Sequence, residues 1–264
     1  SWLYYSDRLV ELPLGVFGVA LATVILPKLS REYARQTPES FNATLNWAIR
    51  LTLLIGLPAT AGLILLAGPI LATLFEYGEF TPHDTYMVSL ALIAYATGLP
   101  AFLLVKVLAP GFFAQQDTAT PVKVGIIAVL VGLVLKILIV VPWMLSDYPA
   151  AHVGLAISTA LAAWVNAGLL GYLLYKRGIF QIEPRIWRFL GQTLAGCAGM
   201  MALLWWLTPD MTQWSAWNGV SRSGQLAMLI VAGMVGFTAI ALLSGMRLAA
   251  LKRDGQHDKF KDED

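Results

Sequence analysis

Residues 124–143 read VGIIAVLVGLVLKILIVVPW, an apolar run in which Lys136 is the single charged residue. A helix needs about 20 apolar residues to cross the hydrocarbon core of a bilayer, where each backbone polar group must find its partner inside the helix. Six further stretches meet the same requirement, at about 9–26, 51–70, 86–105, 153–175, 189–207 and 226–246. The sequence therefore predicts an all-α polytopic membrane protein, a transmembrane helix bundle of seven spans.

The composition agrees with this fold class. Of the 264 residues, 58% are hydrophobic and 13% are charged, whereas roughly a quarter of an ordinary soluble domain is charged. Cys197 is the single cysteine, and the three histidines share no metal-ligand spacing, so we expect no internal disulfide and no metal site. The sequence contains no metalloprotease, serine hydrolase or P-loop motif, which favours translocation or binding over catalysis, with no cofactor and no nucleic-acid partner.

The basic residues indicate how the spans are oriented. In the loops after the second, fourth and sixth spans, Arg222 is the single basic residue. Because basic loops stay in the cytoplasm, we expect Ser1 on the periplasmic side and the C-terminus inside. The chain begins without methionine or a signal peptide, so we expect it to be the later part of a longer polypeptide. Fifteen of the eighteen basic residues follow the other spans: Lys28, Arg31, Arg35, Arg50, Lys106, Lys123, Lys176, Arg177, Arg185, Arg188, Arg247, Lys252, Arg253, Lys259 and Lys261.

The first span opens with charged residues that a membrane helix rarely carries. Arg8 and Glu11 are three positions apart and Asp7 and Glu11 are four apart, so a helix places all three on one side. A charged side chain inside a span costs roughly 2.5–3.5 kcal/mol, so it normally faces a partner or a watery cavity. Two interpretations remain open from the spacing. In the first, Arg8 binds a diphosphate in a cavity while Glu11 and Asp7 orient the guanidinium. In the second, Arg8 and Glu11 form an interfacial ion pair that closes the helix end.

Two further features of the spans bear on transport. Pro13, Gly15 and Gly18 predict a point of bending, because proline removes a backbone hydrogen bond and the glycines lack side chains. Lys136 either faces a central cavity as a cation for an anionic substrate or extends toward the interface near Trp143, roughly 10 Å along the helix. The sequence slightly favours the second reading of Lys136.

Three stretches give the chain a family resemblance. Residues 4–18, YYSDRLVELPLGVFG, with their continuation ATVILPKLS at 22–30, are similar to the signature around the eighth helix of the MurJ/MviN family. Residues 74–81, LFEYGEFT, and 112–121, FFAQQDTATP, are similar to later motifs of that family. The chain thus resembles the C-terminal half of a lipid II flippase of the multidrug/oligosaccharidyl-lipid/polysaccharide exporter superfamily.

The resemblance implies a fourteen-helix transporter of two lobes, whose helices eight to fourteen match the seven spans here. Residues 1–176 would hold five spans of the second lobe. Residues 177–247 would hold two additional helices that form a groove for the lipid tail, and residues 248–264 a disordered cytoplasmic tail. Arg8 matches the family's cavity arginine that contacts the diphosphate, Glu11 matches its acidic neighbour, and Ser1 falls at the external gate. The first lobe, with its own cavity arginines, is missing from this sequence.

The function that the resemblance implies is transfer of lipid II, an undecaprenyl-diphosphate-linked disaccharide peptide, across the bacterial inner membrane by alternating access. This transfer is required for peptidoglycan synthesis, cell wall biogenesis and cell shape. Two alternatives remain open: a related exporter of drugs or other polyprenyl-linked saccharides, and a non-transporting membrane scaffold for cell-wall enzymes. The expected partners are lipid II, membrane lipids and the missing N-terminal lobe of the same protein.

Overall fold

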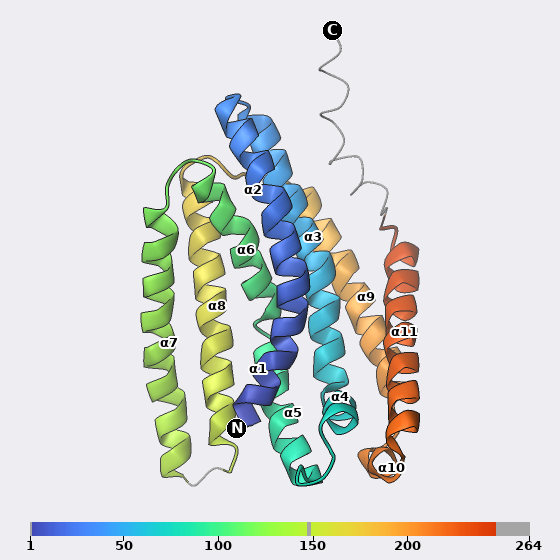
Figure 1. Ribbon diagram of the computed structural model, residues 1–264. Helices are drawn as coiled ribbons and strands as arrows, with labels where there is room; N and C mark the ends of the chain where they lie inside the picture. Colours follow the sequence, from blue (N-terminus) through green and yellow to red (C-terminus); the bar gives the residue numbers. More distant parts are fainter. Residues whose placement is uncertain (1, 147–148, 247–264) are drawn as a thin grey trace.

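The computed structural model describes residues 2–146 and 149–246, and within them the regular secondary structure is helical throughout, as predicted. Most of the long helices run along one direction and form an elongated bundle (Figure 1). Ser1 and the tail at 248–264 lie outside the described residues, so the gate and the disorder stay predictions. The helices are α1 (Trp2–Pro13), the π-helix η1 (Leu14–Gly18), α2 (Val19–Ala34), α3 (Pro38–Leu65), α4 (Ala67–Leu74), α5 (Pro82–Ala96), α6 (Leu99–Phe113), α7 (Ala119–Leu145), α8 (Ala151–Lys176), α9 (Arg185–Leu207), α10 (Met211–Ala216) and α11 (Gly219–Leu243).

The predicted number and order of spans are confirmed. Each of the seven predicted runs overlaps one helical stretch that is long and apolar enough to cross a membrane. The helices extend beyond most of the runs, because the last turns of a span can leave the hydrocarbon and carry polar side chains. The seven stretches in the described residues are Trp2–Ala34, Pro38–Leu65, Pro82–Phe113, Ala119–Leu145, Ala151–Lys176, Arg185–Leu207 and Gly219–Leu243.

Several predicted boundaries were wrong. The second span was expected to start at 51, but α3 begins at Pro38, so Arg50 lies in a helix and not in a loop. The second predicted span crosses a break at Leu66, where α3 ends and α4 begins. The third was expected to end before Lys106, but α6 continues to Phe113, so Lys106 lies inside a span and not in a loop. Residues 107–113 after Lys106 are apolar, but the Pro110–Gly111 pair among them is typical of a turn, so the pattern favoured a shorter helix. The seventh ends at Leu243, three residues before the predicted end at 246.

The third span, made of α5 and α6, lies at the centre of the bundle. In its most apolar 18-residue segment 61% of the residues are buried, whereas 17% are buried in the corresponding segment of the span Ala119–Leu145. The latter span, α7, packs mainly on α8 at one side of the bundle (Figure 1). Gly98 joins α5 to α6 at a close approach, because a Cβ there would lie 2.9 Å from the Cα of Ala160 in α8.

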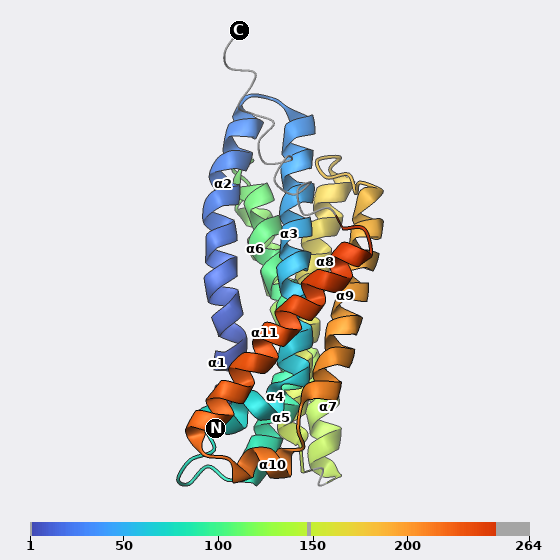
Figure 2. The same cartoon turned by 90° about the vertical axis from the view of Figure 1, so that its right-hand side faces the viewer.

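The last two spans form a pair on the opposite side of the bundle. α9 packs on α3, and α11 crosses the bundle obliquely while packing on α9 (Figure 2). Glycines allow this close approach: a Cβ at Gly196 would lie 2.8 Å from the Phe237 ring, and one at Gly236 would lie 2.7 Å from Leu203 Cδ2. Small residues at such contacts are the usual way for membrane helices to associate. The division into 1–176 and 177–247 stays a prediction.

Candidate functional site

α1 packs one face on the bundle and leaves the other face open. Ser6 and Val10 are buried, whereas the side chains of Arg8 and Glu11 are 59% and 51% exposed. Arg8 Nη1 donates to Glu11 Oε2 over 2.9 Å, and Arg8 Cζ lies 5.1 Å from the centre of the Tyr4 ring. Asp7 is exposed as well. The structure thus places the three charged residues together on the open side of α1, as their spacing indicated.

This charged face is unsuited to contact with lipid tails. An ionised side chain within a span is stable only where water, a partner or a cavity compensates the lost hydration. Arg8 and Glu11 compensate each other in part, yet about half of each side chain remains exposed. The open face of α1 is therefore suited to line a watery cavity or to meet another part of the protein.

The start of α1 is fastened to the start of α5, at the end of the bundle where α10 lies (Figure 1), which we call the α10 end. Trp2 Nε1 donates to Asp84 Oδ1 over 2.7 Å. Asp84 in turn forms a capping box with Thr81, whose hydroxyl accepts from the Asp84 N–H, an arrangement that stabilises helix starts. Tyr5 packs against Phe75 and Phe80 at ring distances of 4.9 and 5.5 Å. These contacts hold the first turns of α1 in place.

The predicted point of bending coincides with an irregular helix. α1 ends at Pro13, and Leu14–Gly18 form the π-helix η1. Because Pro13 has no N–H, the carbonyl four residues earlier loses its α-helical partner. In a π turn each N–H donates to the carbonyl five residues earlier, so the Leu14 N–H could donate to the Leu9 carbonyl that Pro13 leaves without a partner. Gly18 is buried and Gly15 is exposed. The role of this segment as a hinge stays a prediction.

Lys136 lines a groove of about 410 Å³ between η1, α6, α7 and α8. Lys106 and Asn166 line the same groove. Two lysines and an amide on membrane-spanning helices suit a polar passage or an interface with another polar element. Lys106 was expected in a loop, so its place in this groove was not predicted, and the cavity role of Lys136 stays a prediction. The other lining residues are small or apolar, apart from one threonine: Leu14, Phe102, Val105, Gly125, Ala128, Val129, Gly132, Thr159, Ala162 and Ala163.

A second groove, of about 460 Å³, lies against the last two spans. We call it the apolar groove, because its lining is hydrophobic apart from the hydroxyl of Thr238. Such a lining can hold a long hydrocarbon chain and offers little to a polar ligand. Pro13 and Phe17 form one edge, so the groove adjoins the helix that carries Arg8. The remaining lining residues are Leu54, Ile55, Pro58, Ala59, Gly62, Leu63, Leu66, Ile70, Met200, Leu204, Ile230, Gly233, Met234 and Phe237.

The end of the bundle opposite the α10 end is fastened by a second polar cluster, which lies in the stretch 112–121. Asp117 accepts from the N–H and the hydroxyl of Thr120 over 2.9 and 2.6 Å, and from Arg177 Nη1 over 2.8 Å. The two bonds from Thr120, followed by the one from Arg177, lower the pKa of Asp117 from 3.8 to about 2. This cluster joins the start of α7 to the end of α8.

Comparison with known proteins agrees with this arrangement. The family model "Lipid II flippase MurJ" matches residues 1–222. A probable lipid II flippase MurJ of Vibrio cholerae is 44% identical over 253 residues, which cover 96% of this chain and 47% of that protein. The lipid II flippase MurJ of Burkholderia cenocepacia is 40% identical over 206 residues, covering 78% of this chain and 39% of its own length.

A solved structure is also similar. It is a lipid II flippase MurJ in an inward closed conformation, with a TM-score of 0.73 at 26% sequence identity, and the match covers 92% of this chain and 46% of that one. The chain thus spans about half the length of the relatives that it matches. With a family model matching most of its length and relatives at this level of identity, the chain belongs to the lipid II flippase MurJ family.

Proposed function

We propose that this chain supplies the later half of a flippase that moves lipid II from the cytoplasmic to the periplasmic leaflet of the bacterial inner membrane. The observation that carries the proposal is the exposed Arg8–Glu11 pair on the open face of a membrane helix. A guanidinium presents coplanar N–H donors that can bind a diphosphate through two parallel hydrogen bonds. Family membership favours this function over export of drugs or other polyprenyl-linked saccharides.

In this mechanism the two ends of the lipid take different paths. The charged headgroup would pay a large desolvation cost in hydrocarbon, so it crosses in a watery cavity between this chain and the other lobe, held by Arg8. Glu11 keeps the guanidinium oriented toward that cavity. The undecaprenyl tail stays in the apolar groove. The two lobes rock around the bound headgroup and expose it to one side of the membrane at a time.

Replacing Arg8 in the full-length flippase tests the proposal. We expect Arg8→Ala to reduce the flipping rate by about 10- to 100-fold, the effect of losing a hydrogen bond to a charged group. Flipping is measured as the appearance of lipid II on the outer face of proteoliposomes, probed with a reagent that cannot cross the membrane. Arg35→Ala is the matched control, because Arg35 is also exposed but follows the end of α2.

The outcomes separate the candidate functions. Normal flipping by Arg8→Ala, with normal insertion, removes Arg8 from the mechanism. A scaffold for cell-wall enzymes would tolerate Arg8→Ala and lose function on charge reversal in the first turn of α9, Arg185→Glu with Arg188→Glu. An exporter of other saccharides would leave peptidoglycan synthesis intact when the protein is depleted from cells.

A further inference from the structure

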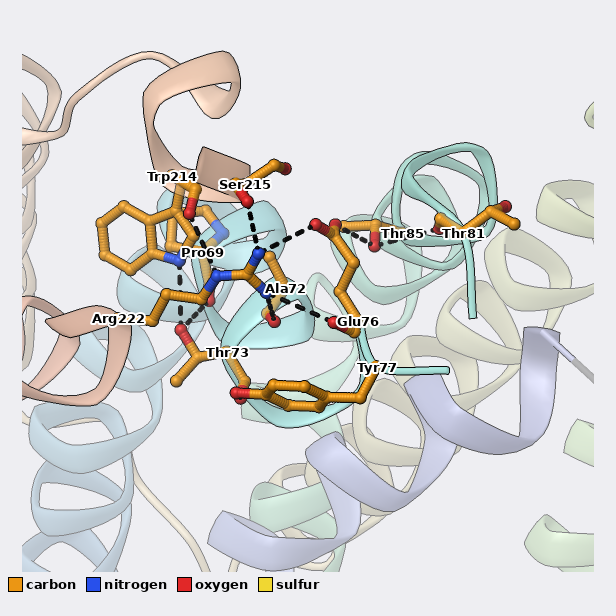
Figure 3. A network of polar contacts seen from close by, with 10 residues as sticks. All are labelled: Pro69, Ala72, Thr73, Glu76, Tyr77, Thr81, Thr85, Trp214, Ser215 and Arg222. Carbon is orange, nitrogen blue, oxygen red and sulfur yellow. Dashed lines mark hydrogen bonds and ion pairs between the residues drawn. The ribbon is translucent and has the colours of Figure 1, made fainter. Parts of the chain in front are cut away.

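Arg222 lies at the start of α11 and is buried, with 6% relative exposure (Figure 3). From its position in the sequence it is the single basic residue expected in loops on the periplasmic side. A buried guanidinium is stable only when its donors find partners. The contacts of Arg222 therefore show whether its side chain is solvated in a loop or holds parts of the fold together.

The guanidinium is bonded to the ends of two other helices. Nε donates to the Trp214 carbonyl over 3.0 Å, Nη1 to the Ala72 carbonyl over 2.9 Å, and Nη2 to the Ser215 carbonyl over 2.7 Å. Ala72 lies in the last turn of α4, and Trp214 and Ser215 lie in the last turn of α10. Carbonyls in the last turn of a helix lack partners within the helix and carry its negative partial charge. One arginine thus satisfies carbonyls from two helix ends.

Glu76 completes the cluster and extends it to α5. Its carboxylate is buried to the same extent as the Arg222 side chain, at 7% exposure for each, and Oε1 lies 3.4 Å from Arg222 Nη2. Its other oxygen, Oε2, accepts from the Thr85 hydroxyl over 2.8 Å. The Trp214 indole N–H donates to Thr73 over 3.1 Å (Figure 3). The cluster therefore joins α4, α5, α10 and α11 at the α10 end.

Two of these helices, α4 and α11, also form walls of the apolar groove. Ile70 of α4 and Ile230 of α11 line the groove, and each lies on the helix that the cluster fastens. Beyond α9, α11 contacts the bundle mainly at α4 and only weakly at α3. Apart from the packing through α9, the bond of Arg222 to α4 is therefore a direct link between α11 and the wall formed by α3 and α4.

We propose that Arg222 is a positioning residue that fixes the width of the apolar groove and so determines its affinity for a long polyprenyl chain. The guanidinium does not touch the chain. It holds α11 at the distance from α4 at which both walls contact a hydrocarbon ligand. This inference rests on the proposed function of the groove as the site of the lipid tail.

The test compares two diphosphates that differ in chain length, undecaprenyl diphosphate and farnesyl diphosphate, on the full-length flippase in lipid nanodiscs. We expect Arg222→Gln to weaken binding of the long chain by about 5- to 150-fold, the usual range for coupling between two sites. Binding of the short chain is expected to stay unchanged. The long-chain affinity of Arg222→Lys is expected to lie between those of the parent protein and Arg222→Gln. One ammonium group cannot reach all the carbonyls that the planar guanidinium contacts. Arg185→Gln, an exposed arginine at the start of α9, is the matched control.

A distance measurement reports on the position of the start of α11 relative to the end of α7. In a Cys197→Ala background, spin labels are placed at Val220 on α11 and Leu145 on α7, which are 83% and 82% exposed. We expect a narrow distance distribution for the parent protein and for Arg185→Gln, and a broadened or shifted one for Arg222→Gln. A variant that only lost stability would lower the melting temperature and leave the distances and the long-chain preference intact.

The failures are distinguishable. A parent protein that binds both diphosphates equally well overturns the tail role of the groove and this inference with it. A parent protein that prefers the long chain, together with an Arg222→Gln variant that keeps that preference and the same distances, overturns the inference alone. If Arg222→Gln does not fold, the same comparison is made with Arg222→Lys, and a parent-like preference in that variant contradicts the proposal.

Discussion

Arg8 and Arg222 carry the same side chain in opposite surroundings. Arg8 is paired with one carboxylate and is 59% exposed, whereas Arg222 is enclosed by carbonyls and a buried carboxylate. The first can still bind a ligand, and the donors of the second are committed to the fold. The sequence predicted the Arg8–Glu11 pair because its spacing is local. It could not predict the partners of Arg222, because Ala72 and Glu76 lie 150 and 146 positions away.

Asp117 allows a prediction about pH at the residue scale. Its pKa in the fold is about 2, below the ordinary 3.8, so its contribution to stability is present above about pH 4 and is lost as the pH falls toward 2. We expect Asp117→Ala to lower stability by about 1 kcal/mol at neutral pH, because a helix-start bond and a partly exposed ion pair are removed. Melting curves between pH 3 and pH 8 check this. A difference from the parent that is as large at pH 3 as at pH 7 would contradict it.

At the scale of elements, hydropathy predicted the spans but not their ends. A span is defined by its apolar residues, so its existence follows from the sequence. The position of its ends depends on how far the helix rises out of the hydrocarbon, which the pattern does not record. Lys106 was placed in a loop for this reason. The break at Leu66 depends on packing around α4, which is likewise not local.

The contact between α9 and α11 gives a prediction at the same scale. At Gly236 a Cβ would lie 2.7 Å from Leu203, whereas at Gly224, on the same helix, nothing lies within 4 Å. We expect Gly236→Leu to destabilise the protein by about 1–3 kcal/mol through overpacking. Gly224→Leu is expected to be neutral or slightly stabilising, since leucine favours helix more than glycine does. The melting temperatures of the two purified full-length variants are compared with that of the parent protein. Equal melting temperatures would show that the two helices are not closely packed.

For the whole molecule, the alternation of basic loops predicts which end of the bundle faces which side of the membrane. We expect the α10 end to be periplasmic. Single cysteines at Val220 and Tyr33, in a Cys197→Ala background, test this in intact cells. Both sites are exposed, and they lie at the start of α11 and the end of α2, which are at opposite ends of the bundle (Figure 1). A thiol reagent that cannot cross the inner membrane should label the cysteine at 220 and spare the one at 33. The reverse pattern would invert the proposed orientation.

The cluster around Arg222 also constrains how the protein is made. A membrane chain is inserted in the order of its synthesis, and Glu76 precedes Arg222 by 146 positions. At about 5–20 residues per second the carboxylate is translated roughly 7–30 seconds before its cation. During that time four more spans must enter the bilayer, and α4 ends without the guanidinium that will cap it. Arg222 thus completes this corner of the protein only after those four spans have been made, and until then the buried carboxylate of Glu76 lacks its cation.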